Sequence, residues 1–240
     1  MTDTALPLAR RVHDPYALGR GPIRYHGSGA GSDGGDAAGG HPREPTGHGE
    51  GGPASKRIIT AYGFWIFLLS DIVMFSGFFA GYAVLSGATA GGPGPRELFE
   101  IPRVAWETVL LLLSSFACGM AGIASGRRNM AWTQGALLVT GLLGFGFLVI
   151  ELLEFRDLIA HGAGPARSAF LSSFFALVGL HGLHVGTGLL WLGTMMAQLW
   201  LKGFRQNVLR RLFCFNLFWH ALDIIWVAIF TLVYLMGKYA

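Results

Sequence analysis

The sequence contains little charge and almost no cysteine. Only 13% of its 240 residues are charged, against roughly a quarter in an ordinary soluble domain, and 52% are hydrophobic. This composition excludes a water-soluble domain. The two cysteines, Cys118 and Cys214, lie inside apolar runs and form no Cys-x-x-Cys pair. The sequence therefore predicts neither a disulfide framework nor a redox motif.

The chain divides into a polar tail and an apolar domain. Residues 1–57 hold 13 of the 36 glycines and no Phe or Trp, and their four histidines are irregularly spaced. A segment with so little to bury cannot offset the entropy lost when a chain is ordered. We therefore predict a disordered, glycine-rich tail over 1–57, without a metal site, and a single membrane domain over 58–240.

The net charge of +4 does not indicate a nucleic-acid-binding protein. The basic residues are spread over the tail and the loops, with no aromatic residues interleaved among them. We expect no nucleic-acid partner, and membrane topology explains the basic residues better.

Five apolar runs are long enough to cross the roughly 30 Å hydrocarbon core of a membrane. Because no water is available there, each run must form a helix that satisfies its own backbone. The sequence therefore predicts an all-α, polytopic bundle of five transmembrane helices. The predicted helices are 58–85, 102–125, 131–155, 170–201 and 212–236.

The distribution of Lys and Arg predicts the orientation. If the N-terminus is cytoplasmic, that side carries 13 of the 18 Lys and Arg residues, and its short loops alone carry six against four. We therefore predict a cytoplasmic N-terminus and a periplasmic C-terminus, in a multi-pass protein of the bacterial inner membrane.

Ionisable side chains at membrane depth are the candidate functional residues, because each is costly there unless it is paired or faces a cavity. The spacing of Asn216, His220 and Asp223 puts them on one stripe of a helix. Near the outer interface we expect a second layer of acids, with Arg103 or Arg156 as partners. The mid-membrane candidates are Asp71, His181, His184, His220 and Asp223; the outer-layer acids are Glu107, Glu151 and Glu154.

Three interpretations of these side chains stay open at this point. They could hold the helices together through hydrogen bonds worth about 1 kcal/mol each. They could instead form a proton-holding or lipid-headgroup site centred on Asp71, because a buried acid can carry a proton. A third interpretation is ligation of a metal or haem by His181 and His184, completed by His220. The histidine spacing is too tight for stacked haems, and we predict no metal site and no catalytic residue.

Small-residue patterns predict where helices pack closely. Three Gly-x-x-x-Gly pairs lie in the predicted spans, and this pattern allows two helix backbones to approach each other. The pairs are Gly77 and Gly81, Gly122 and Gly126, and Gly182 and Gly186.

Three sequence strings resemble subunit III of the haem–copper oxidases. Residues 62–71 (YGFWIFLLSD) with 75–79 (FSGFF) are similar to the start of the core of that family. Residues 173–185 (SFFALVGLHGLHV) and 219–226 (WHALDIIW) match two later motifs, in the same order and on the expected helices. The resemblance covers about residues 58–239.

Within that family, the chain is most similar to the bo-type ubiquinol oxidase branch. It has five predicted helices rather than seven, and Glu151-x-x-Glu154 followed by 164–171 (GPARSAFL) resembles the version in that branch. Position 71 is Asp, where the cytochrome c oxidase branch usually has Glu at its carbodiimide-reactive site.

The resemblance implies an accessory role. It implies a non-redox subunit of a proton-pumping ubiquinol oxidase of the aerobic respiratory chain, which stabilises the catalytic subunit, binds phospholipid and supports proton uptake. Haems and copper would lie in subunit I, with none in this chain, and the partners would be subunits I, II and IV. Two alternatives are a stand-alone homologue assisting another respiratory enzyme, such as nitric oxide reductase, and a proton-coupled transporter.

Overall fold

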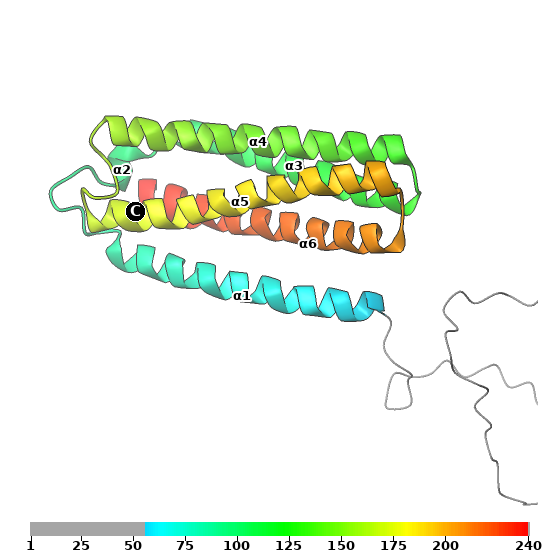
Figure 1. Ribbon diagram of the computed structural model, residues 1–240. Helices are drawn as coiled ribbons and strands as arrows, with labels where there is room; N and C mark the ends of the chain where they lie inside the picture. Colours follow the sequence, from blue (N-terminus) through cyan, green and yellow to red (C-terminus); the bar gives the residue numbers. More distant parts are fainter. Residues whose placement is uncertain (1–55, 240) are drawn as a thin grey trace, which may run out of the picture. The chain divides into compact units, whose positions relative to one another are not determined.

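The computed structural model describes residues 56–239, which are all helix and connection, with no strand in that range (Figure 1). The predicted disordered tail therefore lies almost wholly outside the described residues and stays a prediction. The helices in chain order are α1 (Lys56–Leu85), α2 (Pro95–Leu98), α3 (Ile101–Gly126), α4 (Met130–Ala160), α5 (Ala169–Lys202), α6 (Gln206–Ile229), the π-helix η1 (Phe230–Leu235) and α7 (Met236–Tyr239).

The prediction of five membrane-spanning helices is confirmed. α1, α3, α4, α5 and the continuous run α6–η1–α7 are each long and apolar enough to cross a membrane. The last span begins at Gln206 rather than at 212, because the polar residues at its start continue the helix. The connection after α1 is rich in Gly and Pro and contains the four-residue α2, which begins at Pro95.

Local sequence signals fix several of the helix ends. The Asn129 side chain accepts a hydrogen bond from the Trp132 backbone N–H, and Ser168 does the same for Leu171, so both cap a helix N-terminus. α5 ends at Gly203, whose φ of 65° is a backbone conformation that a side chain disfavours.

Four of the long helices form the body of the bundle, and α1 packs on one side of it. α4 packs along both α3 and α5, and α6 packs along α3 and α5. α1 packs mainly on α5 and α6, as Figure 1 shows. The core between the helices is aromatic, with Phe147, Phe174, Trp219, Trp226 and Tyr234 all at most 1% exposed.

α1 is the least buried of the five spans. Only 11% of its most apolar segment is buried, against 44% for α5. Its inward face is the stripe Leu68, Phe75 and Tyr82, at intervals of seven residues. Most other side chains of α1 are exposed, so this helix presents a broad apolar surface to its surroundings.

The three Gly-x-x-x-Gly pairs do not behave alike. A methyl group added at Gly122 would lie 2.5 Å from Asn216 Nδ2, and one at Gly182 would lie 2.7 Å from Glu151 Oε1, which confirms close packing at both positions. At Gly77 and Gly81 an added methyl group would meet no described atom within 4 Å. The prediction of close packing at that pair is therefore wrong within this chain, because the pair lies on the outer side of α1.

Candidate functional site

A line of paired polar side chains joins α3 to α6, and we call it the polar seam. Trp219 Nε1 donates to Ser114 Oγ at 2.9 Å, and Trp226 Nε1 donates to Thr108 Oγ1 at 3.1 Å. Ser114 Oγ in turn donates to the Thr140 backbone carbonyl of α4. Both tryptophans are thus packing residues whose single polar group has a partner.

The predicted stripe on α6 lies within this seam. Cys118 Sγ donates to Asn216 Oδ1 at 2.7 Å, and Ser115 Oγ is 2.6 Å from His220 Nδ1. Asp223 lies beside Ser115 and interacts electrostatically with His220. The structure therefore brings Asn216, His220 and Asp223 together against α3, with Ser115 as a common neighbour of the last two.

The two histidines of α5 face α1. The rings of His181 and His184 both pack edge-on against Phe75 of α1, with ring centroids 6.3 and 5.2 Å away. His181 is fully buried and stacks on Trp226 at 5.2 Å, whereas His184 is half-buried, with its Nδ1 2.8 Å from the Leu180 carbonyl oxygen. Asp71 is half-buried and lies one turn before Phe75 on the same face of α1. Asp71 and the histidines thus border the same α1–α5 contact.

The outer-layer acids lie together in the core, at the other end of the α3–α6 contact. Glu107, Glu151 and Glu154 are 0%, 2% and 6% exposed. Both carboxyl oxygens of Glu107, one each of Glu151 and Glu154, and the buried hydroxyl of Tyr234 accept or donate no hydrogen bond among the described residues. We call Glu107, Glu151, Glu154 and Tyr234 the acid cluster.

The prediction that Arg103 or Arg156 forms an ion pair with these acids is wrong. Arg103 forms its ion pair with the exposed Asp157, at 3.1 Å, and Arg156 is exposed. Arg103 still interacts electrostatically with Glu107 and Glu154, but it makes no ion pair with either. The reason is geometric: Asp157 lies three residues after Glu154, at the surface end of α4, where Arg103 reaches it without leaving water.

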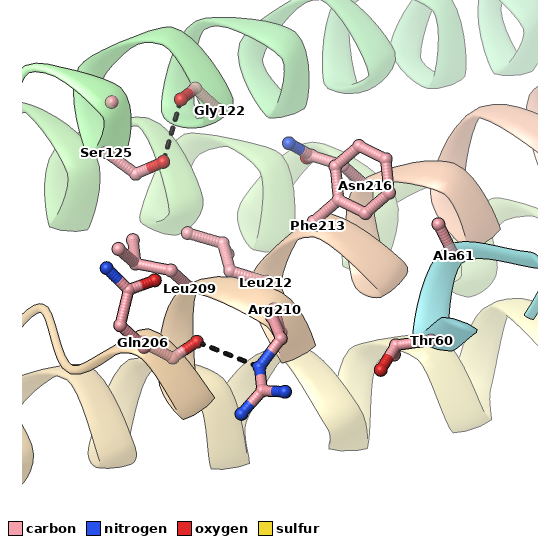
Figure 2. A pocket seen from close by; sticks show the side chains of 11 residues that line it. Thr60, Ala61, Gly122, Ser125, Gln206, Leu209, Arg210, Leu212, Phe213 and Asn216 are labelled. Atoms are coloured by element: carbon pink, nitrogen blue, oxygen red, sulfur yellow. Dashed lines mark hydrogen bonds between the residues drawn. The ribbon is translucent and has the colours of Figure 1, made fainter. Parts of the chain in front are cut away.

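A polar pocket of about 260 Å³ lies where α1, α3 and α6 meet, near the start of α6 (Figure 2). Thr60 and Ala61 of α1 line one side, and Arg210 and Asn216 of α6 line another. Arg210 Nε donates to the Gln206 carbonyl oxygen, so its guanidinium is held at the pocket wall. This pocket combines a cation, amides and apolar side chains, which is the chemistry that suits a lipid headgroup and the start of its acyl chains.

Within residues 56–239, no group of three or more His, Cys, Asp or Glu side chains is placed to hold a metal ion. His220 does not complete a site with His181 and His184: it packs against Ser115 of α3, whereas the other two face Phe75 of α1.

Sequence reasoning missed Ser115 and Tyr234. Ser114 and Ser115 interrupt the apolar run of α3, and that interruption was a usable signal. No sequence signal marked Tyr234. Its inward direction depends on the π-helix Phe230–Leu235, which changes the helical register after Ile229.

Helix number, motif order and the site geometry define a subunit III-type membrane bundle. The family model of cytochrome c oxidase subunit III matches residues 42–238. The chain belongs to this family.

Curated relatives divide between two kinds of oxidase. The chain is 51% identical over 178 residues to the cytochrome bo(3) ubiquinol oxidase subunit 3 of Pseudomonas aeruginosa, covering 74% of this chain and 85% of that one. It is 45% identical to the quinol oxidase subunit 3 of Bacillus subtilis, with 73% and 86% covered. It is 41% identical to a cytochrome c oxidase subunit 3 from a Bacillus species, with 73% and 84% covered.

Proposed function

We propose that this chain is the non-catalytic subunit III of a proton-pumping terminal ubiquinol oxidase. The observation that carries the proposal is the 51% identity, over most of both chains, to a ubiquinol oxidase subunit 3. Quinol is favoured over cytochrome c as the electron donor because the two quinol oxidase relatives named above are 51% and 45% identical to this chain, against 41% for the cytochrome c oxidase relative. Electron transfer from quinol to oxygen would take place on haems and copper in subunit I.

The proposed location is the bacterial inner membrane, with residues 1–57 as a cytoplasmic tail. α1 begins at the end of the bundle where the α3–α4 and α5–α6 connections lie (Figure 1). These two connections and the helix ends beside them carry Arg127, Arg128, Lys202, Arg205, Arg210 and Arg211. Positive charge on the short loops of one side supports a cytoplasmic assignment for that side and a periplasmic C-terminus.

The outer face of α1 is the proposed contact with another membrane subunit, among subunits I, II and IV. Gly77 and Gly81 lie on α1 with open space around them, and small residues allow a second helix backbone to approach closely. A large exposed apolar surface on one helix also suits a chain that works inside a complex.

The proposed role of the polar residues is to support proton uptake and to bind lipid. Asp71 is the one acid of α1 and lies one turn before Phe75, so it borders the contact that includes His184. The pocket of Figure 2, with Arg210 at its wall, is the proposed headgroup site for an anionic phospholipid.

Two substitutions in the assembled complex test this proposal. Asp71→Asn should leave assembly intact and shorten the period over which the oxidase sustains its turnover. Asp223→Asn should instead lower the yield of assembled complex, because it disturbs the buried contact with Ser115 and His220. Assembly is measured by co-purification in mild detergent, and turnover by oxygen consumption with a quinol donor.

The results separate the parts of the proposal. Unchanged rate and lifetime in Asp71→Asn would show that Asp71 has no part in proton uptake. Co-purification with a nitric oxide reductase, and with no quinol oxidase subunit, would replace the proposed complex by the stand-alone alternative. Substrate-driven proton flux in liposomes that hold only this chain would favour a transporter, an activity that nothing in the family match suggests.

A further inference from the structure

The acid cluster is a set of buried groups without enough hydrogen-bond donors. Glu107 and Tyr234 are fully buried, and Glu151 and Glu154 are nearly so. The three carboxyl groups interact electrostatically with one another and with the Tyr234 hydroxyl, so the four groups are close neighbours. They come from three different elements, α3, α4 and η1, which the fold brings to one place.

The cluster lacks a compensating charge. Carboxylates accept hydrogen bonds and donate none, so three ionised carboxylates would each need donors. The neighbouring cation, Arg103, already pairs with Asp157 at the surface. Bringing three like charges into the protein core without partners would cost many kcal/mol, whereas protonated carboxyl groups both lower the charge and supply the missing donors.

Aromatic rings close the cluster on its inner side. Trp226 packs on Phe147 at a centroid distance of 4.6 Å and on His181 at 5.2 Å, and Tyr234 lies beside Trp226. Gly182 allows the Glu151 carboxyl group to lie against the backbone of α5, which closes a further side. Aromatic rings and the backbone of α5 thus pack against the inner side of the cluster.

The remaining side opens to the surface. A pocket of about 470 Å³ is lined by the buried Glu154 and by Arg103 of α3 and Asp157 of α4. Other ionisable groups line the pocket as well: Glu97, Glu100 and His161. Glu154 therefore belongs both to the buried cluster and to a water-accessible pocket, at the end of the bundle where α2 and the α4–α5 connection lie.

We propose that Glu107, Glu151, Glu154 and Tyr234 form a proton-binding site that exchanges protons with the α2 end of the bundle through Glu154. In each exchange, water in the pocket takes the carboxyl proton of Glu154 or returns one to its carboxylate. After a loss, a proton passes from Glu107 or Glu151 to Glu154 when movement of their carboxyl groups brings them into hydrogen-bond contact, and the group that gave the proton becomes the ionised member of the cluster. The proton that the cluster loses is the one that the pocket water gains, and the reverse steps return it. This site is additional to the role proposed for Asp71 and does not depend on it.

The charged groups around the cluster act on it in opposite directions. On α3, Arg103 places positive charge near Glu107 and Glu154. Glu100 and Asp157 add negative charge near Glu154, and the three glutamates add it to one another. On α5, His181 stacks on Trp226 and packs edge-on against Phe147. The exchange is placed at Glu154 because it is the most exposed of the three acids and the one that lines the pocket.

Infrared spectroscopy of the assembled complex tests the proposal without any variant. With glutamate carboxyl carbons isotopically labelled, wild-type protein at neutral pH should give a carbonyl band of protonated, buried carboxyl groups. That band should shift when the solvent is exchanged to D2O, because the protons exchange through the pocket.

Substitutions identify the glutamates that contribute to this carbonyl band. Glu107→Gln, Glu151→Gln and Glu154→Gln should each remove part of its intensity, and Glu154→Gln should also slow the D2O shift of the part that remains. The matched control is Glu97→Gln, an exposed acid in the same pocket, which should change neither property.

Two results would overturn the proposal. One is a wild-type band that is absent, or unchanged in all three variants, which would mean that the glutamates are ionised and that another cation balances them. The other is a band whose D2O shift proceeds at the same rate with and without Glu154, which would mean that the site does not open through this pocket. If one variant fails to assemble, the labelled wild-type protein and the remaining variants still decide between these outcomes.

Discussion

The polar seam joins α3 to α6, the acid cluster joins α3, α4 and η1, and the two regions treat their polar groups in opposite ways. In the seam, Trp219, Trp226, Asn216 and His220 each meet a partner on α3. In the cluster, Glu107 and Tyr234 are as deeply buried as those tryptophans but meet none among the described residues. Hydrogen-bonded pairs join the two helices of the seam, where Asp223 Oδ1 is the exception without a partner among the described residues. In the cluster the missing partners are the rule, which is the observation that the proposed proton-binding site explains.

The difference also separates two kinds of motif residue. The string 219–226 is dominated by seam residues, so its aromatic and polar positions are explained by α3–α6 packing. The Glu151-x-x-Glu154 pair, by contrast, leaves carboxyl oxygens without partners. Similar sequence signals thus carry different physical roles on two helices of the same bundle.

The largest loss of stability is expected from Gly182→Ala, which adds a methyl group where the Glu151 carboxyl group lies against α5. Gly182→Ala would place a methyl group 2.7 Å from Glu151 Oε1, so Glu151 or α5 must shift, at about 1–3 kcal/mol of lost stability. Thermal denaturation of the detergent-purified protein measures the change. The control is Gly186→Ala, whose methyl group would make only an ordinary contact, 3.9 Å from Leu148. Equal losses of stability in the two variants would show that Gly182→Ala acts through helix propensity and not through its contact with Glu151.

A smaller effect is expected from breaking the seam at Ser115. Ser115→Ala removes the 2.6 Å contact with His220 Nδ1 and the neighbour of Asp223, at about 1–2 kcal/mol. The same melting experiment detects it, with Ser70→Ala as the control, because the Ser70 hydroxyl bonds only to a carbonyl of its own helix. If Ser115→Ala melts like the wild type, the seam does not contribute to helix association as described.

The smallest change in stability is expected from a substitution in the acid cluster itself. Glu154→Gln keeps the size of the side chain and removes a titratable group that has no ion-pair partner, so stability should change by less than about 0.5 kcal/mol. A loss as large as that of Ser115→Ala would mean that Glu154 is a packing residue like those of the seam. That result would erase the distinction between the two regions.

Much of the fold was predictable from particular segments. Long apolar runs bounded by Arg127 and Arg128 or by Gly203 predicted the helices to within a few residues, except for the start of the last one. The stripe of Asn216, His220 and Asp223 was predictable because helical spacing alone puts these residues on one face. The five-helix bundle and the family followed from the same strings.

The partners of these side chains were not predictable from spacing. Nothing in the sequence indicated that Arg103 would pair with Asp157 instead of a glutamate, or that Ser115 would lie beside both His220 and Asp223. The role of Gly77 and Gly81 was also wrongly predicted within this chain, because the pattern does not say which helix, or which subunit, approaches it.

The sequence by itself determined the number of helices, the depth of each ionisable residue and the family, because these depend on local composition and on distance along one helix. Only the tertiary structure decided that Asn216, Trp219, His220 and Trp226 of α6 have partners on α3. It also decided that Asp223 Oδ1, the Tyr234 hydroxyl and at least one carboxyl oxygen of each of the three glutamates have none among the described residues. Hydrogen bonding between helices depends on the rotation and register of each helix relative to its neighbour, including the π-turn that brings Tyr234 inward, and helical periodicity leaves that rotation open.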